Sequence, residues 1–169
     1  LHADINFLLF DNYQMRLVTS RYSNATTINL INPECNGTTN MGNTLADLDG
    51  LIVRGRKLIF VETVEEVRLL HHLEGLARTR GMCLYTWDAA EGLACVTPID
   101  RAPRIPRFHS LSEALEYIRT EVAEGIVFIM DSRAQLKDPA VERQLKEIGL
   151  DDACKARSVL LVSSQMELQ

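Results

Sequence analysis

The sequence predicts a three-layer α/β/α fold, in which a mostly parallel sheet lies between two layers of helices. Three observations indicate this fold. Four short apolar runs have the length of buried strands, helical periodicity separates them, and the helical segments begin at capping sequences. Parallel strands joined through helices require right-handed crossovers, which place helices on both faces of the sheet. With 169 residues, of which 46% are hydrophobic, the chain can bury one such core.

Residues 1–44 differ in composition from the rest of the chain. All eight asparagines precede residue 45, whereas the first lysine is Lys57. This Asn-rich head contains three short β-prone runs, at Ile5–Phe10, Tyr13–Thr19 and Thr26–Ile31. Residues 32–43 are rich in Asn, Gly and Thr, which is typical of a linker. We therefore predict two regions, a β-prone head with its linker at 1–44 and an α/β domain at 45–169.

The α/β domain is predicted to begin with a short helix and a buried strand. Thr44 is the expected N-cap of the helix. The apolar residues of that helix recur at helical spacing, at Leu45, Leu48, Leu51 and Ile52. The run Leu58–Glu62 is the first buried strand. Thr63 and Glu66 form a T-x-x-E sequence directly after it, which predicts a capping box at the start of a second helix.

The second helix is expected to end at Gly81, because glycine tolerates the left-handed conformation that commonly terminates helices. Its predicted buried side consists of Val67, Leu70, Leu73, Leu76 and Ala77. The next strand is predicted at Cys83–Trp87, and residues 88–96 form a loop or a short strand. The segment from Pro98 to Arg107 has three prolines and no periodicity, so it predicts irregular structure.

The last third of the chain repeats the alternation of helix and strand twice. An S-x-x-E capping sequence at Ser110 precedes a helix with its apolar side at Leu111, Ala114, Leu115, Ile118 and Val122. A strand is predicted at Ile126–Asp131. Asp138 followed by Pro139 predicts the start of another helix, whose apolar stripe is Val141, Leu145 and Ile148. Ser158–Ser163 is the last predicted strand.

Ligands of open parallel sheets bind at the carboxyl ends of the strands, where this sequence predicts Glu62, Asp88 and Asp131. Asp131 follows five apolar residues, as the acidic residue of a Walker B strand does. A phosphate-binding loop also requires glycines and a lysine between a strand and its helix. The turn from Thr63 to Glu66 contains neither and ends in two glutamates, and the sequence has no Walker A or G-x-G-x-x-G motif. We therefore predict no catalytic residue, metal ligand or cofactor in this domain.

Two alternatives to this interpretation stay open. In the first, Asp88 and Asp131 surround a magnesium ion in a stand-alone enzyme or a phosphoacceptor domain. In the second, the domain is a degenerate nucleotide-binding domain that retains a nucleotide without hydrolysing it. His71 and His72 support neither, because adjacent residues on a helix point about 100° apart and cannot both face one ligand.

A locally basic stretch is the candidate for protein binding, since it could contact an acidic surface through Arg101, Arg104, Arg107 and His109. The net charge of −5 argues against nucleic acid and anionic membranes as partners. No apolar run approaches the roughly 18 residues that a spanning helix needs. The four cysteines form no C-x-x-C pair, and no signal-peptide pattern opens the sequence. We therefore expect protein partners, in the cytoplasm.

The serial order of several segments resembles one known family. Leu51–Glu66 reads LIVRGRKLIFVETVEE, and Leu84–Leu93 reads LYTWDAAEGL. They are similar to LI-x-AR-x-P-LIY-x-x-T-x-EE and LY-x-W-x-x-x-x-GL in the region that precedes the ATPase module of AAA ATPases from cyanobacteria, algal chloroplasts and other bacteria. Shorter similarities follow in the same order at Ser112–Ile118, Ile126–Asp131, Lys137–Leu145 and Val159–Ser164. The resemblance covers about residues 45–169.

The resemblance implies a RecA-like, degenerate P-loop-like domain without a nucleotide site of its own. In that family a true AAA module follows, binds ATP and Mg, and assembles into a ring. The domain is then expected to be a non-catalytic regulatory or assembly domain that contacts other subunits or the AAA module, in the cytoplasm or the chloroplast stroma. The sequence departs from the family where Met130 replaces a lysine and where Ser132 and Arg133 replace an aromatic residue and a histidine, which leaves the role of Asp131 open.

Overall fold

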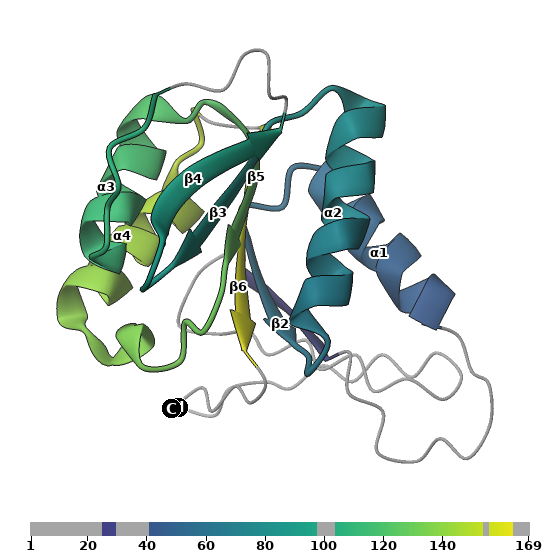
Figure 1. The fold of residues 1–169 in the computed structure, drawn as a ribbon, viewed down its shortest axis with the longest axis horizontal. Coiled ribbons are helices and arrows are strands. Elements are labelled where there is room, and N and C mark those ends of the chain that lie inside the picture. The colour runs from purple at the N-terminus through teal and green to yellow at the C-terminus, as the bar shows by residue number, and fades with distance from the viewer. Residues whose placement is uncertain (1–24, 30–40, 98–103, 154–155, 164–169) are drawn as a thin grey trace.

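The structure, a computed structural model, describes residues 25–29, 41–97, 104–153 and 156–163 (Figure 1). The strands predicted at Ile5–Phe10 and Tyr13–Thr19 lie outside these residues, as does most of the predicted linker. Among the described residues, no helix is both long enough and apolar enough to span a bilayer.

Six strands form one sheet in the order β1-β2-β6-β5-β3-β4. Their bounds are β1 Ala25–Asn29, β2 Leu58–Glu62, β3 Leu84–Asp88, β4 Gly92–Thr97, β5 Glu124–Ile129 and β6 Ala156–Ser163. All neighbouring pairs are parallel except β3 and β4, which form an antiparallel hairpin. The predicted α/β fold with a mostly parallel sheet is therefore confirmed, and the segment that could be a loop or a short strand contains β4.

The strand predicted at Thr26–Ile31 in the Asn-rich head is present as β1. It pairs in parallel with β2 along its whole length, from Ala25 opposite Leu58 to Asn29 opposite Glu62. A segment of the head is thus an edge strand of the central sheet.

Helices of the described residues cover both faces of the sheet (Figure 1). Their bounds are α1 Met41–Val53, α2 Glu66–Arg80, α3 Leu111–Glu121 and α4 Pro139–Leu150. Helices α1 and α2 lie on one face, and α3 and α4 lie on the other. Each layer therefore has its own hydrophobic core.

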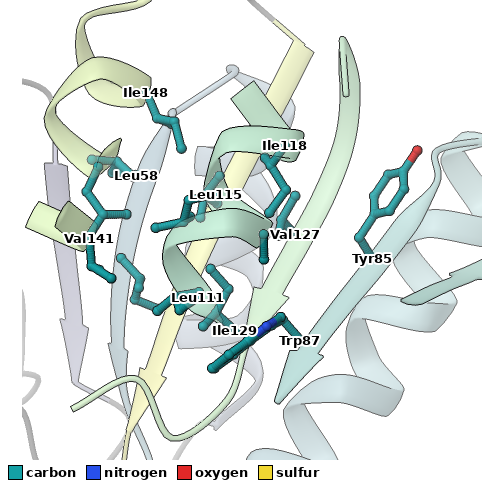
Figure 2. Packing of buried hydrophobic residues seen from close by; sticks show 14 of the residues in the cluster. Leu58, Tyr85, Trp87, Leu111, Leu115, Ile118, Val127, Ile129, Val141 and Ile148 are labelled. Atoms are coloured by element: carbon teal, nitrogen blue, oxygen red, sulfur yellow. The ribbon is translucent and has the colours of Figure 1, made fainter. Parts of the chain in front are cut away.

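The strands are apolar on both faces, as expected for parallel strands buried between helices. In β2, Leu58 and Phe60 pack against the α3 and α4 layer, whereas Ile59 and Val61 pack against α1 and α2. The core beneath α3 and α4 also contains Trp87, which Figure 2 shows beside Ile129. The same cluster includes Leu111, Leu115, Ile118, Val127, Val141 and Ile148. The continuous apolar runs of the sequence supply side chains to both cores.

The last two helices match their predicted starts and apolar sides. Residues Leu111, Ala114, Leu115, Ile118, Val141, Leu145 and Ile148 are all buried. Asp138 caps α4 by accepting a hydrogen bond from the Ala140 N–H at 2.9 Å, with Pro139 at the first helical position. Ser110 is the N-cap residue of α3 as predicted, but its side chain makes no capping hydrogen bond, so the predicted S-x-x-E capping box is wrong.

The first two helices differ from their predictions. Helix α1 already begins at Met41, so the prediction that Thr44 caps it is wrong. In α2 the buried residues are Leu69, Leu73 and Ala77, whereas Val67 is 68% exposed. Val67 precedes Leu69 by two positions, or about 200° around the helix, so it faces solvent. The C-terminus of α2 is as predicted, because Gly81 adopts the left-handed conformation at φ 64°.

Candidate functional site

The carboxyl ends of the parallel strands lie at one edge of the sheet (Figure 1), which we call the carboxyl edge. The chain passes from β2 to α2 on one face, and from β5 to α4 on the other. Strand β6 lies between β2 and β5. This reversal of connection is a topological switch point, the position at which open α/β sheets bind their ligands. Asp131 follows β5 there, as the sequence predicted.

The turn between β2 and α2 lies at the carboxyl edge. Thr63 is buried, and its N–H donates a hydrogen bond to the Ser163 carbonyl at 3.0 Å, which ties the turn to β6. The Thr63 hydroxyl accepts a hydrogen bond from the Glu65 N–H, also at 3.0 Å. Helix α2 begins only at Glu66, with Glu65 as an N-cap residue that makes no side-chain capping bond.

The predicted capping box is therefore wrong. A capping box needs Thr63 at the N-cap and Glu66 three residues later, inside the helix. In the structure the Thr63 hydroxyl accepts its hydrogen bond from the N–H of Glu65, which precedes the helix. Glu66 is therefore the first helical residue and not the third. A T-x-x-E sequence is compatible with a capping box and also with a turn that threonine closes before the helix, so the sequence alone does not distinguish them.

The charges of two carboxylates, those of Glu66 and Asp131, interact at the carboxyl edge. Glu66 is half-buried, and its burial together with the negative charge of Asp131 raises the pKa of the Glu66 carboxyl above its ordinary value. A triphosphate at the start of α2 would meet these same charges instead of the glycines and lysine of a phosphate-binding loop. Sequence reasoning placed Asp131 here but missed its interaction with Glu66.

The backbone on both sides of Asp131 is tied to neighbouring strands. The Met130 N–H donates to the Trp87 carbonyl at 3.0 Å. Ser132 is fully buried, and its N–H and hydroxyl both lie 3.4 Å from the Val162 carbonyl oxygen. Asp131 itself is exposed and has a φ of 50°, a left-handed conformation that aspartate tolerates better than most residues. The fold thus exposes the Asp131 carboxylate to solvent.

Asp88 has different surroundings from Asp131. One oxygen of its carboxylate accepts hydrogen bonds from the N–H groups of Ala90 and Glu91, at 2.8 and 2.7 Å. These bonds close the turn between β3 and β4, a common role for aspartate. No group of three or more His, Cys, Asp or Glu side chains within the described part of the chain is arranged to hold a metal ion.

The basic stretch lies on the surface before α3. Arg104, Arg107 and His109 are exposed, whereas Arg101 lies outside the described residues. Arg107 approaches Glu91 at 3.9 Å, but both side chains are about three-quarters exposed, so this ion pair contributes little. The segment is held to the sheet by Trp87, whose indole N–H donates to the Phe108 carbonyl at 2.8 Å. Binding of a partner by this stretch stays a prediction.

The adjacent histidines have separate environments. His72 Nε2 lies 2.7 Å from the Asp49 carboxylate and links α2 to α1, whereas His71 is exposed. This arrangement fits the expectation that the two histidines do not share one ligand.

A comparison with protein families identifies the relationship of the chain. The N-terminal domain of SpoVK-like AAA ATPases matches residues 44–168. The chain belongs to this family. No curated protein and no solved structure was found to match it. The resemblance expected over about residues 45–169 is therefore confirmed.

The carboxyl edge of this SpoVK-like N-terminal domain carries acidic side chains at the position where nucleotide-binding sheets have a loop that binds phosphate. Glu65 is the N-cap residue of α2, Glu66 is its first residue, and the charge of Asp131 acts on Glu66. Negative charge near a helix N-terminus interacts favourably with the helix dipole, so Glu66 uses the electrostatic feature that would otherwise attract a phosphate.

Proposed function

We propose that this domain is a non-catalytic regulatory or assembly domain of an AAA ATPase, which acts through protein–protein contacts and binds no nucleotide itself. The observation that carries the proposal is the acidic start of α2 at the switch point of the sheet, where Glu65 and Glu66 stand in place of the glycines and lysine of a phosphate-binding loop. The RecA-like relationship belongs to the same proposal and is supported by the parallel, doubly covered sheet. A location in the cytoplasm or the chloroplast stroma is supported by Cys83 and Cys95, which are both free thiols.

The carboxyl edge is also the proposed contact with the ATPase module. Strand β6 ends there at Ser163, so a module that follows this domain in the family is tethered at this edge. Val64 and Val67 lie beside it at the start of α2 and are 72% and 68% exposed. Exposed apolar side chains next to charged ones are typical of surfaces that bind another protein.

Calorimetry tests the absence of a nucleotide site. The 169-residue chain, titrated with ATP or ADP and magnesium at millimolar concentration, is expected to give no heat beyond dilution, because the carboxyl edge repels polyphosphate. Magnesium-dependent binding that is lost in Asp131→Asn but kept in Asp88→Asn would contradict the proposal. It would instead support the degenerate nucleotide-binding alternative.

The assembly role is tested in the full-length product of the gene. The double variant Val64→Asp, Val67→Asp is expected to lower the sedimentation coefficient of the assembled ATPase or change its ATP hydrolysis rate at least twofold, because the contact loses apolar area. Val53→Asp is the matched control, since Val53 is 49% exposed but ends α1 at the opposite edge of the sheet. Equal behaviour of the double variant and the control would reject a contact at the carboxyl edge.

A further inference from the structure

An open groove of about 640 Å³ runs along the outer side of α3. Its lining includes Phe108, Glu113, Glu116, Tyr117, Glu121 and Gln144, and it contains no basic residue. Helix α3 turns its apolar side to the core and presents Glu113, Glu116, Tyr117 and Glu121 to the groove, whereas Phe108 precedes α3 and Gln144 belongs to α4. The groove therefore combines aromatic rings with negative charge.

The aromatic part of the groove consists of Phe108 and Tyr117. Their ring centroids lie 5.3 Å apart at an interplanar angle of 37°. The backbone of Phe108 is attached to β3, because its carbonyl accepts a hydrogen bond from the Trp87 indole. Both rings also pack against the core of this layer. They form a rigid aromatic surface, over which a cationic side chain is attracted.

The carboxylates of the groove differ in whether they form ion pairs within the domain. Glu116 is bound by Arg119 at 2.6 Å, and this hydrogen bond, together with one from Gln144, lowers the pKa of the Glu116 carboxyl. Glu113 and Glu121 make no ion pair with any residue that the structure describes. Two negative charges are therefore available beside the aromatic rings.

The wall toward α4 contains an acceptor without a donor. Gln144 Oε1 is buried and has no hydrogen-bond partner among the described residues, while the amide of the same side chain interacts with Glu116. A buried acceptor that lacks a donor is unfavourable, and a donor brought by a ligand would relieve it. The groove thus offers acceptors, from Gln144 and the glutamates, to the donors of a ligand.

We propose that the α3 groove binds a basic segment of a partner protein, with one arginine side chain over Phe108 and Tyr117 and with basic side chains near Glu113 and Glu121. Arginine fits better than lysine, because its planar group stacks on aromatic rings and can donate two hydrogen bonds to one carboxylate. The inference rests on one part of the proposed function, namely that the domain acts by binding other proteins. It concerns a different surface, however, so nucleotide binding at the carboxyl edge would leave it untouched.

The test uses a hexapeptide of alternating glycine and arginine, capped at both ends, at physiological salt. Binding to the 169-residue chain is expected with a dissociation constant below about 1 mM, and NMR shifts are expected at Phe108, Glu113 and Tyr117. The double variant Glu113→Lys, Glu121→Lys is expected to weaken binding about tenfold, and the lysine peptide about threefold. Tyr117→Leu keeps an apolar side chain but removes the ring, and is expected to weaken binding about threefold.

Asp47→Lys is the matched control for charge, because Asp47 is exposed on α1 in the opposite helix layer. It is expected to bind the arginine peptide as the unaltered chain does. The proposal is overturned if the peptide fails to bind at millimolar concentration, if Asp47→Lys weakens binding as much as the double variant, or if the shifts lie outside the groove. Equal binding of a peptide with glutamate in place of arginine would also overturn it.

Discussion

Replacement of Arg157 by methionine is expected to lower the free energy of unfolding by about 2–4 kcal/mol. Arg157 lies in β6 with only 3% of its surface exposed. Its guanidinium donates to the carbonyls of Ile118 and Val122 at 2.7 and 2.8 Å, and to the carboxylate of Asp151 at 3.2 Å. The last carbonyls of a helix have no partner within the helix, so this side chain satisfies the end of α3. Methionine fills much of the space but donates no hydrogen bond.

Arg157→Lys separates charge from geometry. Lysine keeps the positive charge near Asp151 but presents a single ammonium group in place of the guanidinium fork, so it is expected to recover only part of the loss. Arg143→Met is the matched surface control, because the Arg143 side chain is 81% exposed and pairs with Glu147 at 3.0 Å. That variant is expected to change stability by less than about 0.5 kcal/mol. Denaturant unfolding measures all three, and equal stability of the methionine variants would contradict the role of Arg157.

Arg157 also shows what the sequence pattern leaves out. The last strand was predicted at Ser158–Ser163 from its apolar run, but β6 begins at Ala156 and includes the arginine. A charged residue at the start of an apolar run resembles a solvent-exposed boundary. Its burial depends on the end of α3 lying against β6, which is a contact between segments 35 or more residues apart. Local periodicity carries no information about such a contact.

The strands and the later helices were predictable because local signals agree with the final packing. Apolar runs define the parallel strands, and Asp138 before Pro139 defines the start of α4. The first two helices were less predictable, since a T-x-x-E pattern does not state whether the threonine caps a helix or closes the turn before it. The order of the strands, with β6 between β2 and β5, depends on long-range pairing.

The candidate site was predictable only in part, for the same reason. The sequence placed Asp131 after a buried strand and showed acids where a phosphate loop would need glycines. It did not show that the charge of Asp131 acts on Glu66, or that Asp88 closes the hairpin turn. Each of those facts depends on which strands are neighbours. The groove on α3 likewise joins Phe108 to Tyr117 and to a residue of α4, which no single motif contains.

The second large effect is expected at Gly125 in β5. Its φ of 128° lies in a region that side-chain-bearing residues rarely adopt, and a Cβ atom there would lie 2.7 Å from the backbone oxygen of Cys83. That oxygen accepts the hydrogen bond of the Ile126 N–H at 2.9 Å, so it cannot move without loosening the pairing of β3 with β5. Gly125→Ala is therefore expected to cost about 3 kcal/mol, or about 6–12 °C in melting temperature for a chain of this size.

Gly75→Ala gives the opposite expectation for the same chemical change. Gly75 is exposed on α2, and a Cβ atom there would meet nothing within 4 Å. Alanine favours the helix by up to about 1 kcal/mol relative to glycine, so this variant is expected to melt a few degrees higher. The sign of the effect then depends on backbone conformation and on the nearest backbone atom. Thermal unfolding of the two variants, followed by circular dichroism, measures this difference. A Gly125→Ala variant that melts with or above Gly75→Ala would show that β5 does not approach Cys83 as described.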